Sequence, residues 1–404
     1  MVFAVTFCAT SVLGQDFVWT KCNAPSNQWQ FVTSSSDGMD LMAAAIYPTN
    51  GIWISTNAGV KWTKSATPIV NSWTCGASSS DGTQLAAADN INRGIYTSTN
   101  LGLTWTQTSA PTNQNWWSIA SSSDGTELVA ASGSSIKGSG IFTSINSGFT
   151  WQPAKTPTNG TYSVAASSDG TKMFAVDVFA KTIYVSTDSG QTWTQTIAPA
   201  KAWRCIASSS DGTKLVVGAG NGVSADNGIY TSTNSGSTWT PASVASEEIW
   251  FCMASSSDGT KTVAIASSGL TVNGKSVCPI YYSTNSGLTW AKTSAPATGF
   301  WSIAMSSDGT RLVAVSQYGE IYTATAPPSP TTPPSLTLQF FSGYPLLSLY
   351  GTLGDTYTVQ YTTNLAVPNW TPMLIVPNLS TSPFQMIDPA GMGQPMRFYR
   401  AIQQ

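Results

Sequence analysis

The sequence predicts an all-β protein, a seven-bladed β-propeller closed by its N-terminal strand and followed by a small C-terminal β-sandwich. The first observation is a Ser-Asp-Gly triplet that recurs along the chain at intervals of 42 to 50 residues, a period typical of propellers. Its aspartates are Asp37, Asp81, Asp124, Asp169, Asp211, Asp258 and Asp308. The second observation is that short apolar runs of period 2 separate turn-forming residues, which favours strands. The third is that no stretch keeps a helical period with caps.

Each repeat is expected to form four short antiparallel strands, A to D, and the fifth repeat illustrates them. Strand A covers residues 203–207, strand B residues 214–218 and strand C residues 228–232, and strand D begins at Trp239. Ser-Asp-Gly forms the turn between strands A and B, where Gly readily adopts a positive φ. The repeated aspartates are therefore expected to form turns and not to act in catalysis.

The last repeat stops after residues 320–325 and lacks a fourth strand. The segment F-V-W-T-K-C-N-A-P at 17–25 parallels L-T-W-T-Q-T-S-A-P at 103–111, which is a fourth strand with its following turn. We therefore expect the N-terminal strand to complete the last blade, because closing the ring removes an unpaired edge.

The domain boundaries follow from changes in composition. Residues 1–14 form an apolar run that we interpret as a secretory signal peptide, although it lacks a basic start and a short buried strand is the alternative. Residues 15–325 form the propeller, 326–335 a Pro-rich linker and 336–404 the β-sandwich, in which Tyr357, Val359 and Tyr361 alternate. A signal peptide and a charge-poor surface predict a secreted, extracellular protein.

Composition excludes several functions for the 404-residue chain. Charged residues make up 9% and the net charge is −2, so neither nucleic acid nor an anionic membrane is an expected partner. Histidine is absent, which removes the commonest general base and transition-metal ligand. We expect no cofactor, no metal, no transmembrane segment and a monomer. The six cysteines suggest no disulfide framework, although Cys22 and Cys278 could meet where the last two blades adjoin.

An eight-residue turn joins strands C and D in six repeats, with the pattern S-T-N-x-G-x-T-W in three copies and one residue changed in each of the others. The copies span residues 55–62, 98–105, 144–151, 186–193, 232–239 and 283–290. The turn resembles the Asp-box, S-x-D-x-G-x-T-W, of sialidase-like (BNR-repeat) propellers, although the third residue is Asp only at Asp188 and Asn elsewhere. The resemblance implies that fold, with the boxes on hairpins away from the ligand face. Sialidase activity is rejected because the expected arginine triad cannot be assembled and the F/Y-R-I-P motif is absent.

The tail motifs G-D-T-Y-T-V-Q-Y at 354–361 and M-R-F-Y-R-A at 396–401 resemble C-terminal β-sandwich tails of secreted bacterial proteins. This resemblance implies a fold for the tail and no particular role.

Topology separates two faces of the propeller. The nearly uniform A–B and C–D turns form one face, here called the turn face. The D–A and B–C loops differ between repeats and form the other, here called the variable face, where function on a repeat scaffold usually lies. Ligand-binding candidates on this face are Arg93, Trp117, Asp177, Lys181, Lys201, Trp203, Arg204, Glu247, Glu248 and Trp250. Aromatic residues stand eight places before six of the seven repeat aspartates, with Trp117, Tyr162 and Trp301 one place later, and they either stack on a sugar or pack between blades.

Three functions remain open. The first is a non-catalytic binding or scaffold protein that recognises a glycan or a protein through the variable face. The second is a glycoside hydrolase with a carboxylate pair drawn from Asp177, Asp226, Glu247 and Glu248, because hydrolysis needs two carboxyl groups at a defined separation. The third is a protein-assembly factor similar to the photosystem II assembly propellers. That family is expected to carry an arginine patch, and Arg93 and Arg204 are the arginines available on the relevant face.

Overall fold

A computed structural model provides the structure of the chain. It describes residues 17–46, 50–67, 72–89, 94–133, 140–154, 161–221, 226–244, 248–267, 269, 271–272, 274–326, 335–341, 344–350, 356–363, 369–377, 379, 382–391 and 397–403. The expected signal peptide and most of the expected linker lie outside these residues. The chain divides into two compact units, residues 1–326 and 327–404.

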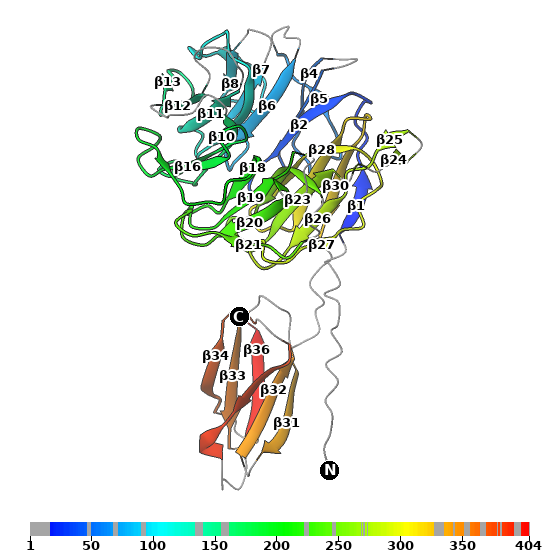
Figure 1. Ribbon diagram of the computed structural model, residues 1–404. Helices are drawn as coiled ribbons and strands as arrows, with labels where there is room; N and C mark the ends of the chain where they lie inside the picture. Colours follow the sequence, from blue (N-terminus) through cyan, green and yellow to red (C-terminus); the bar gives the residue numbers. More distant parts are fainter. Residues whose placement is uncertain are drawn as a thin grey trace. The chain divides into compact units, whose positions relative to one another are not determined.

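The described part of the first unit forms seven four-stranded antiparallel sheets, numbered here in chain order and arranged around a common centre (Figure 1). Sheet 1 contains β2 (Trp29–Ser34), β3 (Leu41–Ala45), β4 (Gly51–Ser55) and β5 (Thr63–Lys64). Sheet 2 contains β6 (Trp73–Ser78), β7 (Leu85–Asp89), β8 (Gly94–Ser98) and β9 (Thr106–Gln107). Sheet 3 contains β10 (Trp116–Ser121), β11 (Leu128–Ser132), β12 (Gly140–Ser144) and β13 (Gln152–Pro153).

The remaining sheets follow the same order of strands. Sheet 4 contains β14 (Thr161–Ala166), β15 (Met173–Asp177), β16 (Thr182–Ser186) and β17 (Thr194–Gln195). Sheet 5 contains β18 (Trp203–Ser208), β19 (Leu215–Ala219), β20 (Gly228–Ser232) and β21 (Thr240–Pro241). Sheet 6 contains β22 (Ile249–Ser255), β23 (Thr262–Ser267), β26 (Ile280–Ser283) and β27 (Ala291–Lys292). Between β23 and β26, the hairpin of β24 (Thr271–Val272) and β25 (Lys275–Ser276) forms a separate two-stranded sheet. Sheet 7 contains β28 (Phe300–Met305), β29 (Arg311–Ser316), β30 (Ile321–Thr325) and β1 (Val18–Lys21).

The N-terminal strand supplies the fourth strand of sheet 7. β1 pairs antiparallel with β30, with Trp19 opposite Ala324, and the Cys22 amide donates to the Ile321 carbonyl at 2.8 Å. Phe17, just before β1, packs its ring against Tyr282 of sheet 6 with centroids 4.9 Å apart. Residues from the two ends of the unit therefore share one sheet and one core cluster.

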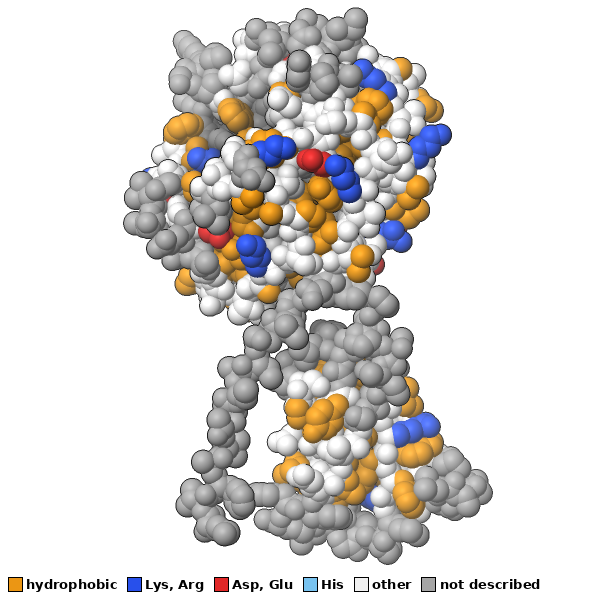
Figure 2. Space-filling model, turned by 90° about the vertical axis from the view of Figure 1, so that its right-hand side faces the viewer, with side chains coloured by type: hydrophobic (Ala, Val, Ile, Leu, Met, Phe, Trp, Pro, Cys, Tyr) orange, Lys and Arg blue, Asp and Glu red, His pale blue; other side chains and the backbone are white. Residues whose placement is uncertain are grey.

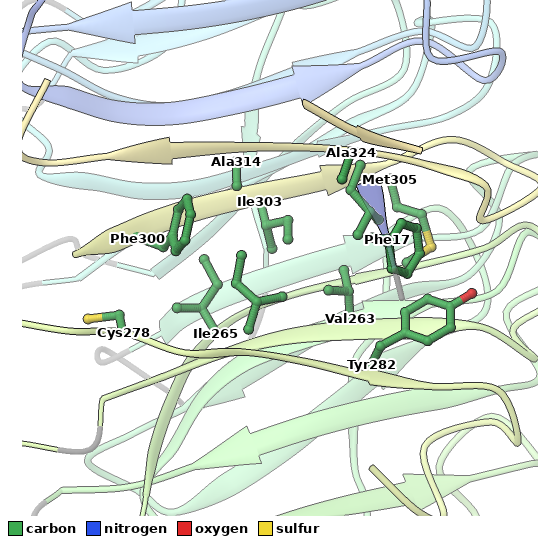
Figure 3. Close-up of a cluster of buried hydrophobic side chains, with 12 residues drawn as sticks. Phe17, Val263, Ile265, Cys278, Tyr282, Phe300, Ile303, Met305, Ala314 and Ala324 are labelled. Atoms are coloured by element: carbon green, nitrogen blue, oxygen red, sulfur yellow. The ribbon is translucent and has the colours of Figure 1, made fainter. Parts of the chain in front are cut away.

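Hydrophobic clusters fill the spaces between successive sheets. Figure 3 shows the cluster between sheets 6 and 7, where Phe300 and Ile303 face Val263 and Ile265, and Phe17 lies beside them. Six of the clusters include the large aromatic residue at the first or second position of the first strand of a sheet. These residues are Trp29, Trp73, Trp116, Trp203, Trp250 and Phe300, and none exposes any surface. Burying both faces of each sheet explains the apolar runs of the second strands.

A cycle of backbone hydrogen bonds links the sheets at the turn face. In each sheet the Ser before the repeat Asp donates its amide to the carbonyl of the equivalent Ser in the next sheet, at 2.7 or 2.8 Å. The seven residues, here called the serine ring, are Ser36, Ser80, Ser123, Ser168, Ser210, Ser257 and Ser307. The bond from Ser307 to Ser36 joins the last sheet to the first.

The second unit contains two three-stranded antiparallel sheets. One holds β31 (Ser335–Phe341), β32 (Tyr344–Tyr350) and β35 (Phe384–Ile387), and the other holds β33 (Tyr357–Thr362), β34 (Thr371–Val376) and β36 (Phe398–Gln403). A short 3-10 helix, η2 (Pro389–Gly391), precedes β36. Leu347 and Leu349 of one sheet share a core cluster with Tyr357 and Val359 of the other.

On the side that Figure 2 presents, Lys, Arg, Asp and Glu side chains are few and scattered among uncharged ones. Within the part of the chain that the structure describes, no helix has the length and apolar character needed to span a membrane.

Candidate functional site

A β-bulge interrupts the first strand of every sheet in the first unit. In each case the register shifts across one residue, which directly follows Thr161 in sheet 4 and the large aromatic residue at the start of the strand in the other sheets, where Ile249 precedes Trp250 in sheet 6. The bulged residues are Gln30, Thr74, Trp117, Tyr162, Arg204, Phe251 and Trp301. A bulge leaves its extra residue outside the ladder and redirects its side chain. In the six sheets whose bulged side chain the structure describes, the fold therefore places one non-repeating side chain at the variable end of the innermost strand.

Aromatic side chains are prominent among these bulged residues. The indoles of Trp117 and Trp301 are each 46% exposed. Trp117 donates its ring N–H to the Gly133 carbonyl at 2.6 Å, which holds the indole in place. Trp301 lies beside Phe251, with ring centroids 5.6 Å apart. These rings can offer flat apolar surfaces to a ligand without unfolding.

Arg204 is the cationic member of the bulged set. Its Nε donates to the carbonyl of Gly220, at the end of the second strand of the same sheet. Of the predicted ligand-binding residues, Trp117 and Arg204 thus occupy equivalent places in sheets 3 and 5.

The predicted aromatic platform of Trp203 and Trp250 is wrong, because both side chains are fully buried. Trp203 packs edge-on against Tyr230, with centroids 5.4 Å apart, and Trp250 packs against Tyr281 at 5.1 Å. The alternative expectation, packing between blades, applies to this position. The residue directly after each of these aromatics is the one that the bulge turns outward, so that position was the available signal in the sequence. The sequence named Trp301 as a residue that could stack on a sugar without including it among the ligand-binding candidates, and it did not single out Phe251.

A cationic cluster joins sheets 4 and 5 at the variable face. Lys181 Nζ lies 2.9 Å from Asp226 Oδ2, and the Asn221 side-chain amide donates to the same oxygen at 2.8 Å. The hydrogen bond from Lys181 is the main cause that lowers the pKa of Asp226, and the charge of Lys201 also contributes. The structure therefore brings the predicted residues Lys181, Lys201 and Asp226 together.

Asp177 has a structural position at the end of β15. Its side chain is buried, and Oδ1 accepts hydrogen bonds from the amides of Phe179 and Ala180 at 2.9 and 2.8 Å. These bonds shape the turn between the second and third strands of sheet 4. This geometry makes Asp177 a turn-former and not a group that projects to a ligand.

Glu248 contacts the third strand of its own sheet. Tyr281 Oη donates to Glu248 Oε1 at 2.7 Å. Burial and this hydrogen bond raise the pKa of Tyr281 above its ordinary value, so the phenol keeps its proton. The other predicted candidates, Arg93 and Glu247, lie outside the described residues.

The cysteines at the two candidate disulfide positions are free. Cys22 Sγ lies 3.8 Å from Thr323 Oγ1 and packs with the cluster between sheets 7 and 1. Cys278 is buried in the cluster between sheets 6 and 7. Sheet 7 separates the two clusters, so the considered pairing of Cys22 with Cys278 is not formed.

Comparisons with known proteins identify the class of fold. No family model and no curated protein matches the sequence. The chain is similar to the solved GH74 xyloglucanase from Xanthomonas campestris, with a TM-score of 0.57 and 15% identity over 83% of this chain and 59% of that one. It is similar to YCF48 bound to D1 peptide, with a TM-score of 0.56 and 13% identity over 77% of this chain and 97% of that one. It is also similar to the Myceliophteria thermophila Cps50 (Swd1) β-propeller domain, with a TM-score of 0.57 and 11% identity over 76% of this chain and 99% of that one.

These similarities show that the first unit has a β-propeller fold. The chain spans 59% of the length of the Xanthomonas xyloglucanase and the same share of the GH74 enzyme from Niastella koreensis. Because the sequence identities are only 11 to 16%, these structural similarities show the fold alone.

Proposed function

We propose that the protein is a secreted, non-catalytic binding protein whose propeller has seven blades and binds a carbohydrate on its variable face. The observation that carries this proposal is the set of bulged residues, because the same local distortion places half-exposed Trp117 and Trp301 at the same end of two sheets. Indole faces stack on the C–H faces of sugar rings, and neighbouring polar groups bind the hydroxyls.

Two features of the fold support seven blades and closure by β1. The described residues contain seven four-stranded sheets, and the serine ring returns from sheet 7 to sheet 1. Pairing of β1 with β30 supplies the fourth strand that the last repeat lacks. The apolar start of the sequence and its low charge support secretion, and the repeated S-T-N-x-G-x-T-W turns support an Asp-box propeller.

Binding is favoured over hydrolysis by the state of the described carboxylates. Asp177 accepts hydrogen bonds from two backbone amides, and Glu248 accepts one from Tyr281. Asp226 is paired with Lys181, which lowers its pKa, whereas a glycosidase general acid needs a raised pKa. None of these three has the environment of a proton donor to a leaving group.

A peptide ligand is the second candidate, favoured by the cluster of Lys181, Lys201 and Asp226. Charged side chains at the edge of a surface steer and orient a protein partner more than they bind a neutral sugar. The D1 peptide bound by YCF48 shows that one similar propeller binds a peptide.

The proposal is tested by calorimetry with xyloglucan oligosaccharides and a panel of other polysaccharides. A binding sugar should lose about tenfold or more in affinity with Trp117→Ala and Trp301→Ala, since each removes a stacking surface. The matched control is Phe149→Ala, a more exposed aromatic residue on the turn face, at 79% exposure. Release of reducing ends, or a sugar affinity that changes with Phe149 and not with Trp117 and Trp301, contradicts the proposal.

A further inference from the structure

The turn face contains a cavity of about 440 Å³ at the centre of the first unit. Its walls consist of residues one to three places before the repeat aspartates, from all seven sheets. Every lining residue is a serine except Ala166 and Met305. A volume of this size suits a small molecule or one side chain of a partner, and the wall is made almost entirely of hydroxyl groups.

Many of the serine hydroxyls already donate their proton to another group of the protein, so they cannot donate it to a ligand. In five sheets the serine three places before the Asp donates its proton to the next residue's carbonyl, at 2.9 to 3.1 Å. These residues are Ser34, Ser78, Ser121, Ser208 and Ser255. The serine two places before the Asp donates to the Asp carboxylate at 2.6 Å. With its proton already used, each of the five hydroxyls three places before the Asp can only accept further hydrogen bonds. The serine two places before the Asp is buried and also accepts a backbone amide at 2.9 or 3.0 Å, so it adds no free acceptor.

The charges around the cavity favour a cation. Serine hydroxyls and backbone amides that donate to Asp37, Asp81, Asp124, Asp169 and Asp211 lower the pKa of each carboxyl, so each is charged at neutral pH. Asp258, Asp308, Asp40 and Glu127 add to this negative charge on the same turns.

Four cations on these turns offset part of the negative charge of the carboxylates. Lys172, Lys214 and Lys261 each donate from Nζ to the carbonyl of the Asp in the next sheet, at 2.8, 2.8 and 2.9 Å. The fourth cation is Arg311, whose side chain lies against Gly38 of sheet 1. Nine carboxylates against four cations leave the turns negative.

We propose that this cavity binds a primary ammonium group. Such a group carries three donors and a positive charge, which match the five acceptor hydroxyls of the wall and the negative turns. An anion would be repelled, and an apolar ligand would find little apolar wall. The ammonium group belongs either to a free polyamine or to a lysine side chain of a partner protein. The turn face then has a binding role in addition to its role in linking the sheets.

The test is calorimetric titration of the full chain at low salt with spermidine and with the peptide Gly-Gly-Lys-Gly-Gly. Sorbitol supplies hydroxyls without charge, and tetramethylammonium supplies charge without donors. Binding is expected for spermidine or the lysine peptide, weakening as salt rises, and at least about tenfold tighter than for either control. Spermidine alone identifies a polyamine site, and the peptide alone identifies a site for a partner's lysine. Absence of binding at 10 mM of both probes, at roughly the weakest measurable affinity, or equal binding of sorbitol or tetramethylammonium, overturns the proposal.

A triple variant, Ser34→Ala, Ser121→Ala and Ser208→Ala, localises the binding. The carbonyls that these hydroxyls contact also accept bonds from Gly38, Gly125 and Gly212 amides at 3.0 to 3.1 Å, so they remain paired. The variant is therefore expected to keep its melting temperature and to lose about tenfold in ammonium affinity. Trp117→Ala, at the other end of the strands, should leave that affinity unchanged. An unchanged affinity in the triple variant, measured on folded protein, overturns the assignment to this cavity.

Discussion

At the scale of single residues, the repeated aspartates act as turn-formers. In sheet 5, Asp211 Oδ1 accepts hydrogen bonds from the Ser209 hydroxyl at 2.6 Å and from the Thr213 amide at 2.9 Å. The next residue, Gly212, adopts φ +66°, a conformation that side-chain-bearing residues rarely adopt. The same pattern in the other sheets explains why Ser-Asp-Gly is repeated with so little change.

The pKa of Asp211 gives a prediction about acid stability. Hydrogen bonds from Ser209 and Thr213 lower it to about 2, below the unfolded value near 3.9. Its contribution to stability is therefore present above about pH 4 and is lost as the pH falls towards 2. Asp211→Asn should lower the free energy of unfolding by less than about 1 kcal/mol at pH 7, since the site is exposed, and by much less at pH 2, where about half of the Asp211 carboxyls are protonated. Urea unfolding at the two pH values measures this, and an equal loss at both contradicts it.

Asp188→Asn is the matched control, because five equivalent turns already contain Asn. Asn57 accepts from Ser55 Oγ and from the Lys61 amide at 3.0 and 2.8 Å, as Asp188 accepts from Ser186 and Thr192. We expect the same melting temperature as the parent at pH 7. A marked loss would show that the carboxylate of Asp188 has a role that the turn does not require.

The two classes of tryptophan predict opposite responses to truncation. Trp203→Ala should cost about 3–5 kcal/mol, because it empties a fully buried site between sheets 4 and 5. Trp117→Ala should cost about 1 kcal/mol or less, because its indole is half exposed and loses one hydrogen bond. Thermal and chemical unfolding measure both. Equal losses would contradict the assignment of Trp203 to the core and Trp117 to the surface.

At the scale of elements, the outer strand of sheet 7 comes from the opposite end of the unit. The Cys22 amide donates to Ile321, and in an antiparallel pair alternate residues of an edge strand point their amides at the partner. The amide of Thr20 therefore faces β30, whereas the amide of Lys21 faces outward.

This alternation predicts different effects of proline within β1. Thr20→Pro should lower the free energy of unfolding by roughly 1–3 kcal/mol, because it removes a ladder hydrogen bond and disturbs the pairing. Lys21→Pro should cost less, because it removes no ladder bond and only a 3.8 Å contact with Glu320 between partly exposed groups. Melting temperatures measure the difference. Equal and small effects would mean that β1 contributes little to sheet 7.

At the scale of the whole molecule, two units with separate cores share one chain. Residues 1–326 and 327–404 are each compact, and the Pro-rich segment lies where they join. Limited proteolysis with a broad-specificity enzyme should leave a stable fragment that ends near Ala326. Its melting transition should match the propeller transition in the full chain, as measured by calorimetry. A fragment that melts well below that transition, or degradation straight to small peptides, would show that the units depend on each other.

The repeat period, the period-2 runs and the Gly-containing turns were enough to predict an all-β fold of repeated four-stranded sheets. They do so because these patterns are local, and the chemistry of a tight turn or a pleated strand lies within a few residues. The expected strands agree closely in sheet 5, except that the outer strand starts at Thr240, one residue after Trp239. The extra hairpin between β23 and β26 lies in a loop without a repeat pattern, which offered no such signal.

The sequence alone therefore determined the strands, the turns and the role of the repeat aspartates in this protein. Only the tertiary structure decided which of two neighbouring residues at the start of a first strand is buried. Trp203 and Arg204 are neighbours in the chain, and a bulge sends one into the core and turns the other outward. Likewise, only the ring of sheets brings serines from seven distant turns around one cavity. Burial and convergence depend on contacts between residues about 45 positions apart, and a local pattern contains no information about them.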